Sequence, residues 1–133
     1  MKVAIIIPCY NEADRLDVNK FVDYLLQNKH VHFYFIDDGS TDNTIIILNE
    51  IMSKINSQVT LLKNESKKGK AESVRLGVIE SFKMNPDYIG YLDADLAAPI
   101  EEIDYLLNII QEDTTKEVVF ASRIQLIGNE IKR

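Results

Sequence analysis

Short apolar runs rich in β-branched residues alternate along this chain with longer segments of helical period. The runs occupy residues 3–7, 32–36, 59–62, 88–92 and 117–121. The first is apolar at every position, which is typical of a strand buried on both faces of a parallel sheet. The sequence therefore predicts five strands joined by helical crossovers.

The segments between the runs carry apolar residues at helical spacing. They cover residues 13–28, 42–55 and 70–84, and Pro99 is suited to open a fourth helix because its missing N–H costs nothing in the first turn. For residues 70–84 we expect a helix that bears the apolar residues Val74, Leu76, Val78, Ile79 and Phe82. Repeated strand-helix units predict an α/β fold with a mostly parallel sheet and helices on both faces.

Composition limits the class of protein. The 133 residues, of which 46% are apolar and 27% charged, suit one globular domain. A net charge of -6 argues against a nucleic-acid-binding surface, which needs clustered lysine and arginine in excess. The lone cysteine, Cys9, excludes an internal disulfide, suits a reducing compartment and is expected to be a packing residue. With no membrane-spanning run or signal peptide in the sequence, we expect a soluble, cytoplasmic chain.

Two carboxylates, Asp93 and Asp95, follow the fourth run with one residue between them. In an extended segment residues i and i+2 point to the same side, so the two acids are expected to converge. A pair of carboxylates can anchor Mg²⁺ while leaving positions free for phosphate oxygens. By itself the pair is also compatible with an ordinary solvated loop.

Other polar residues fall at the ends of the first two runs, at residues 8–12 and 37–42. The carboxyl ends of parallel strands meet at one sheet edge, where ligands of open α/β sheets bind. Asp42 is expected to have a structural role as a helix cap. Asp37 and Asp38 should point to opposite faces, so that one looks into the crevice and the other braces a turn through Gly39.

Basic residues could supply contacts for an anion. We expect Lys70 and Arg75 to contribute to a phosphate site and Lys67 and Lys68 to be surface residues. Arg123, just past the fifth run, suits a donor diphosphate or an acceptor phosphate because a guanidinium binds phosphate in bidentate fashion.

Four motifs, in this order, resemble the signature of family 2 glycosyltransferases with the GT-A fold. They are residues 7–12, residues 37–44, Gly69-Lys70 together with Arg75-x-Gly77, and residues 93–96. The resemblance covers nearly the whole chain. It implies that residues 1–133 form a nucleotide-sugar-binding GT-A domain.

The resemblance also implies roles for single residues. Pro8, Tyr10 and Glu12 would form the wall around the base and ribose of the donor, and Asp38 would accept the imide N–H of uracil or the corresponding group of another base. Asp93 would approach the ribose or the metal, and Asp95 would hold Mn²⁺ or Mg²⁺ against the diphosphate. A dication there neutralises the leaving nucleoside diphosphate.

Within the family, residues 93–99 and 121–123 look most like the branch that transfers glucose or mannose to a polyprenyl (dolichyl-type) phosphate. Mannosyl-transferring relatives typically have glutamine where this chain has Ala97, which favours glucose and therefore UDP-glucose as the donor. The expected partners are thus a nucleotide sugar and a lipid-phosphate or sugar acceptor.

The family's acceptor-binding half follows the fifth strand, and this sequence stops at Arg133. We therefore expect the chain to be the donor-binding half of an inverting enzyme. The catalytic residues stay unknown, and the chain alone is expected to bind a donor without turnover. The full-length protein is expected to act at the cytoplasmic face of a membrane. Apolar surface meant for the other half would favour a homo-oligomer.

Two other classes remain open at this point. A phosphorylation-receiver domain has a similar length, a parallel sheet and acids around Mg²⁺, but its acidic pair follows the first strand and a lysine follows the fifth. A nucleotidyltransferase should carry a glycine-rich basic loop after the first strand, where this chain has Tyr10-Asn11-Glu12.

Overall fold

A computed structural model describes residues 1–121. Its elements alternate as the sequence predicts: β1 (Val3–Cys9), α1 (Val18–Gln27), β2 (Val31–Asp37), α2 (Thr44–Lys54), η1 (Asn56–Gln58), β3 (Val59–Lys63), α3 (Lys70–Ser81), η2 (Phe82–Met84), β4 (Tyr88–Tyr91) and α4 (Glu102–Glu112). The chain divides into two compact units, Met1–Ile100 and the part from Glu101 onwards. The sheet lies within the first unit.

The four strands form one parallel sheet in the order β3-β2-β1-β4. The central pair is in register from Val3 opposite Val31 to Cys9 opposite Asp37, and both strands are almost completely buried. Receiver domains share the flavodoxin-like order 2-1-3-4-5, in which the first strand lies between the second and third. Here β1 lies between β2 and β4, so the strand order excludes the receiver alternative.

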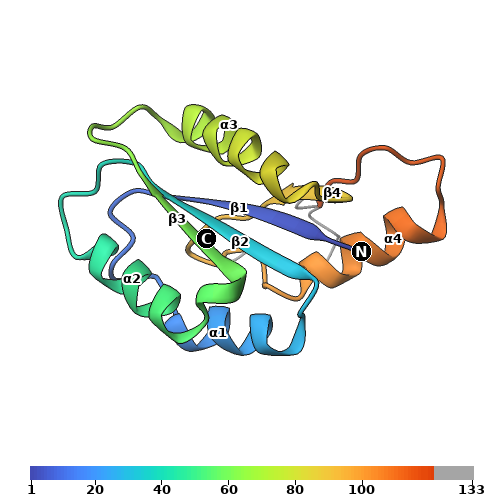
Figure 1. Cartoon of the computed structure of the whole chain (residues 1–133), viewed down its shortest axis with the longest axis horizontal. Coiled ribbons are helices and arrows are strands. Elements are labelled where there is room, and N and C mark those ends of the chain that lie inside the picture. The colour runs from blue at the N-terminus through green and yellow to red at the C-terminus, as the bar shows by residue number, and fades with distance from the viewer. Residues whose placement is uncertain (122–133) are drawn as a thin grey trace, which may run out of the picture. The chain divides into compact units, whose positions relative to one another are not determined.

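Helices cover both faces of the sheet, as expected from the repeated strand-helix units. In Figure 1, α1 and α2 lie on one face and α3 on the other. On the α1 face the ring of Phe21 packs edge-on against Phe33 and Phe35, at centroid distances of 5.9 and 5.3 Å. On the opposite face Ala4, Ile6, Tyr34 and Ile36 form a buried cluster against which Val78 packs.

Helix α3 buries small residues. Its fully buried residues are Ser73, Gly77 and Ser81, whereas Ile79 and Phe82 are exposed. A Cβ on Gly77 would lie 2.4 Å from Cγ2 of Ile6, closer than carbon atoms can approach. Of the apolar residues expected on this segment, Val78 packs against the buried cluster, but the closest contact with the sheet is made by small residues, which let the helix lie near it.

Two boundaries also shift. The first helix begins at Val18, not near residue 13, because the side chain of Asp17 accepts a hydrogen bond from the Lys20 N–H and caps it there. The fourth helix begins at Glu102, three residues beyond Pro99. In both places a turn precedes the helix.

The predicted fifth strand is wrong. Residues 117–121 form no strand in the described part of the chain, and the side chains of Val118 and Phe120 are exposed. A strand needs a neighbouring strand to pair its N–H and C=O groups, so an apolar run alone does not make one. No helix within residues 1–121 has both the length and the apolar character needed to cross a membrane.

Candidate functional site

A cavity of about 460 Å³ opens at the carboxyl ends of β1, β2 and β4. Its lining comes from Pro8, Cys9, Tyr10, Glu12, Asp38, Lys67, Lys70, Ser73, Asp93, Ala94 and Asp95. Backbone hydrogen bonds between neighbouring strands continue one residue beyond the strand ends. The Asp38 N–H donates to the Cys9 carbonyl at 2.8 Å, and the Leu92 N–H donates to the Ile6 carbonyl at 3.0 Å. The strand ends therefore bring three separate sequence motifs to one place.

Most of the residues predicted from the sequence line this cavity. They are Pro8, Tyr10, Glu12, Asp38, Lys70, Asp93 and Asp95. Arg75 is not part of the lining: its guanidinium binds the carboxylate of Glu72 on the same helix, at 2.6 and 2.8 Å. Arg123 lies outside the described residues.

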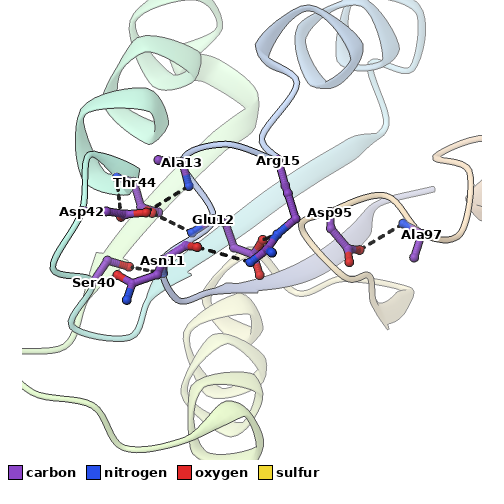
Figure 2. A network of polar contacts seen from close by, with 9 residues as sticks. All are labelled: Asn11, Glu12, Ala13, Arg15, Ser40, Asp42, Thr44, Asp95 and Ala97. Atoms are coloured by element: carbon purple, nitrogen blue, oxygen red, sulfur yellow. Dashed lines mark hydrogen bonds and ion pairs between the residues drawn. The ribbon is translucent and has the colours of Figure 1, made fainter. Parts of the chain in front are cut away.

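The loop after β1 is fastened to the loop after β2. Asn11 adopts a left-handed backbone conformation, with φ of 51°. Its N–H donates to the Ser40 hydroxyl at 3.0 Å, while its side-chain oxygen accepts from the Thr41 N–H at 2.9 Å. The Glu12 N–H donates to the hydroxyl of Thr44 at 2.9 Å, as Figure 2 shows. These bonds fix Asn11, and they thereby also position its two neighbours in the cavity lining, Tyr10 and Glu12.

Asp42 has the structural role expected of it. Its carboxylate accepts hydrogen bonds from the N–H and hydroxyl of Thr44, the first residue of α2, at 2.9 and 2.5 Å. It also accepts one from the Ala13 N–H at 3.3 Å (Figure 2). The hydrogen bond from the Thr44 hydroxyl is the main reason that the pKa of Asp42 is lowered. Asp42 therefore joins the helix start to the first loop.

Glu12 pairs with Arg15, a residue that the sequence analysis did not single out. Nε of Arg15 lies 2.6 Å from Oε2 of Glu12, and its Nη2 donates to the Asn11 carbonyl at 3.3 Å (Figure 2). The hydrogen bond to Glu12 raises the pKa of Arg15, and the charge of Asp95 adds to this effect. Arg15 lies in a turn just before α1. Nothing in the sequence of this turn indicates that the arginine side chain points back toward Glu12.

Asp38 organises the basic loop at residues 64–69. It is buried, and its carboxylate accepts hydrogen bonds from the N–H of Lys68 at 2.8 Å, the N–H of Gly69 at 2.9 Å and the side-chain amide of Asn64 at 2.9 Å. Burial opposes ionisation, but these donors outweigh it and lower the pKa of Asp38. Asp37 points elsewhere, as expected for neighbours on a strand, and is completely buried.

Two lysines of this basic region face the cavity. Lys67 is exposed, as expected, but it also lines the cavity, where its Nζ lies 3.9 Å from the centre of the Tyr10 ring. The Nζ of Lys70 lies 2.5 Å from Oδ1 of Asp93 and 5.2 Å from the centre of the Tyr91 ring. The hydrogen bond to Asp93 raises the pKa of Lys70.

Asp93 and Asp95 do not lie in an extended segment, contrary to the sequence-based expectation. The strand ends at Tyr91, and the Leu96 N–H closes a turn onto the Asp93 carbonyl at 3.2 Å, with φ of 53° at Leu96. Oδ1 of Asp95 accepts a hydrogen bond from the Ala97 N–H at 3.0 Å (Figure 2). Both acids still line the cavity because the turn carries them past the end of β4.

The acids of the cavity fit a hard divalent cation that is shared with a ligand. No group of three or more histidine, cysteine or acidic residues within residues 1–121 is arranged as a complete metal site. Mg²⁺, however, is commonly held by one or two carboxylates together with substrate phosphates and water. The exposed carboxylate of Asp95, with Asp93 in the same lining, meets that requirement.

Cys9 and Asp37, the last residues of β1 and β2, are both buried. Cys9 is buried in the lining, and burial raises the pKa of its thiol, which agrees with a packing role. Neither carboxylate oxygen of Asp37 has a hydrogen-bond partner among the described residues.

Comparison with known proteins agrees with this arrangement. The sequence profile of glycosyl transferase family 2 matches residues 4–131. The dolichol-phosphate mannosyltransferase of Pyrococcus furiosus is 32% identical over 124 residues, which are 92% of this chain and 33% of that enzyme. The chain spans between 33% and 52% of the length of the curated relatives considered.

Solved structures share the fold at low sequence identity. S. aureus TarS 1-349 in complex with UDP-GlcNAc has a TM-score of 0.65 and 20% identity, with 84% of this chain and 32% of that chain covered. A mannosyltransferase from Pyrobaculum calidifontis, in complex with GDP-Man and Mn²⁺, has a TM-score of 0.62 and 19% identity, with 82% and 32% covered. These likenesses identify the GT-A fold. The profile match over nearly the whole sequence, together with the relative in Pyrococcus furiosus, shows that this chain belongs to glycosyl transferase family 2.

Proposed function

We propose that this chain is the donor-binding half of an inverting glycosyltransferase that moves a hexose from a nucleotide sugar to a polyprenyl phosphate. The observation that carries the proposal is the cavity at the strand ends. It gathers an aromatic ring, carboxylates and two lysines from four separate segments of the chain. These groups suit the three parts of such a donor, namely its base, its ribose and its diphosphate.

Tyr10, with Pro8 and Glu12 beside it, forms the wall for the base and ribose in this proposal. The flat ring of a tyrosine loses little conformational entropy when a base stacks on it. Asp38 lines the same cavity, and its carboxylate also accepts hydrogen bonds from the loop that carries the lysines. Its proposed contact with the imide N–H of uracil would therefore couple the position of that loop to the base.

Asp95, with Asp93 beside it, would hold Mn²⁺ or Mg²⁺ in the proposed site. The dication supplies positive charge that stabilises the leaving nucleoside diphosphate. Lys70 would help to position that diphosphate from the end of α3, where it is already paired with Asp93. Arg123 remains proposed as a further phosphate contact, outside the described residues. Arg75 is a weaker part of the proposal because its guanidinium is bound to Glu72.

The reaction proposed for the complete enzyme needs no general base from this chain. An oxygen of the acceptor phosphate attacks the anomeric carbon, and the bond from that carbon to the donor diphosphate breaks with its electron pair leaving on the nucleoside diphosphate. A phosphate monoester is mostly dianionic at neutral pH, since its second pKa is near 6. The acceptor still requires positioning, because proximity and in-line orientation supply much of the rate.

UDP-glucose is the proposed donor. Ala97 stands at the position where mannosyl-transferring relatives typically have glutamine, and its N–H is bound to Asp95. The named relative transfers mannose to dolichol phosphate, which supports a polyprenyl phosphate acceptor while leaving mannose as the competing sugar.

Ligand-observed NMR on the chain with Mg²⁺ tests this proposal. UDP-glucose, UDP-GlcNAc and GDP-mannose are titrated separately, and the same experiment follows displacement by UDP and by GDP. We expect UDP-glucose to bind most tightly and UDP to displace it. Tighter binding of GDP-mannose would overturn the donor assignment, whereas binding of none of these nucleotides would overturn the proposed function.

A further inference from the structure

The ammonium of Lys67 covers the ring that forms one wall of the cavity. Its Nζ lies 3.9 Å from the centre of the Tyr10 ring, and both side chains belong to the lining. The negative face of an aromatic ring attracts a cation, but the attraction is weak where the cation is exposed to water, as Lys67 is. A ligand that stacks on Tyr10 can therefore displace this lysine.

The backbone that carries Lys67 is held in place. Gly39 has φ of 71°, and a Cβ on it would lie 2.9 Å from the backbone N of Lys67, so the two loops touch. The next two N–H groups, of Lys68 and Gly69, donate to Asp38. Rearrangement of Lys67 is thus confined to its flexible four-carbon stem.

The second lysine of the cavity is paired in a comparable way. Nζ of Lys70 lies 2.5 Å from Oδ1 of Asp93. Both ammonium groups therefore contact residues that the proposed donor would also contact, Tyr10 for its base and Asp93 for its ribose. A donor that takes those residues leaves both cations beside its diphosphate.

We propose that Lys67 is a donor-binding residue with two alternating partners: the Tyr10 ring in the free protein and the donor diphosphate once a base stacks on that ring. The inference rests on the proposed function, because it takes Tyr10 as the wall for the base. Phosphate oxygens carry full negative charge and form stronger hydrogen bonds with an ammonium than a ring face does. Lys67 therefore opposes binding of a base alone and favours binding of a base that carries a diphosphate.

The variant Lys67→Ala separates these two effects. NMR titrations measure the affinities of uridine, which has no phosphate, and of UDP, both in the presence of Mg²⁺. Loss of the competing cation should tighten uridine binding about two- to fivefold, the change that corresponds to an exposed cation–π contact. Loss of the phosphate contact should weaken UDP binding about fivefold. The two affinities change in opposite directions.

Lys68→Ala is the matched control, because it removes the same charge from the same loop at a residue that does not line the cavity. It should change the ratio of the UDP and uridine affinities little, and Lys67→Arg, which keeps a cation, should preserve that ratio. An unchanged ratio in Lys67→Ala, or uridine binding that fails to tighten, overturns the role of Lys67 while UDP binding to the original chain upholds the proposed function. Absence of UDP binding to the original chain overturns both.

Discussion

At the scale of single residues, Asp38 connects the sheet to the basic loop of the cavity. Three hydrogen-bond donors converge on its buried carboxylate, two of them backbone N–H groups of that loop. Without the negative charge those donors would face a poorer acceptor on this buried side chain. Asp38 should therefore contribute to stability as well as to ligand binding.

Asp38→Asn tests this role. The amide keeps the shape but directs hydrogen atoms toward existing donors, so we expect the free energy of unfolding at pH 7 to fall by about 1–3 kcal/mol. The pKa of Asp38 is lowered in the folded state, so its contribution is present above the unfolded pKa of about 4 and is lost as the pH falls through the folded value. Urea unfolding at pH 7 and near pH 3 should show the difference from the original chain shrink in acid.

Asp23→Asn, an exposed change on α1, is the control and should alter the free energy of unfolding by less than about 0.5 kcal/mol at either pH. A difference between Asp38→Asn and the original chain that grew on acidification would contradict the assigned role.

Individual residues of the site could be predicted from the sequence where polar side chains follow a buried strand. Tyr10, Glu12 and Asp38 follow buried apolar runs, and parallel strands bring their carboxyl ends together. Lys67 was missed because lysines around a glycine usually mark a solvated turn. The contact depends on Gly39 and Asp38 holding that loop down, which spacing along the chain does not reveal.

At the scale of elements, α3 sets how closely the basic loop approaches the sheet. The helix begins at Lys70, at the rim of the cavity, and packs on β1 and β2 through small residues. Gly77 lies against Ile6 and Ile36, both fully buried. A larger residue there would have to push the helix and its first residue away from the sheet.

Gly77→Ala should therefore destabilise the protein although alanine favours helices. The gain in helix propensity is about 1 kcal/mol, whereas forcing a methyl group to 2.4 Å from Cγ2 of Ile6 requires movement of a packed strand or helix. We expect a net loss of about 1–2 kcal/mol in the free energy of unfolding, measured by chemical denaturation. Ile79→Ala, on the exposed side of α3, should cost little. A more stable Gly77→Ala protein would show that the contact between helix and sheet is loose.

The four paired strands were predictable because each is a short run rich in β-branched, aromatic or other apolar residues between segments of helical period. Periodicity did not reveal the buried side of α3, since a hydrophobic stripe cannot indicate a helix that packs through serine and glycine. The strand prediction failed at residues 117–121, where the apolar run pairs with no strand among the described residues. Pairing depends on the rest of the fold, and a short run does not specify it.

At the scale of the whole molecule, an acidic protein is proposed to bind an acidic ligand. The net charge of -6 repels a nucleoside diphosphate at long range. The lysines of the cavity offset this only in part, because Lys70 is already paired with Asp93. A divalent cation at Asp95 would supply the remaining positive charge, so we expect donor binding to depend on the metal.

The cavity is lined by residues between Pro8 and Asp95, all within the unit Met1–Ile100. Donor binding is therefore proposed as a property of that unit. Positioning of the acceptor is proposed to need parts of the complete enzyme outside that unit. Binding, rather than turnover, is the appropriate test of the chain.

The proposal that Asp95 holds a metal needed for donor binding is tested by calorimetric titration of UDP-glucose. The titration is made with Mn²⁺ and again with EDTA, on the original chain and on Asp95→Asn. Asp14→Asn is the control, because it removes an equal charge from an exposed residue outside the lining. We expect UDP-glucose binding that requires Mn²⁺, persists in Asp14→Asn and is lost in Asp95→Asn. Equal binding in EDTA, or undiminished binding in Asp95→Asn, would contradict the proposal.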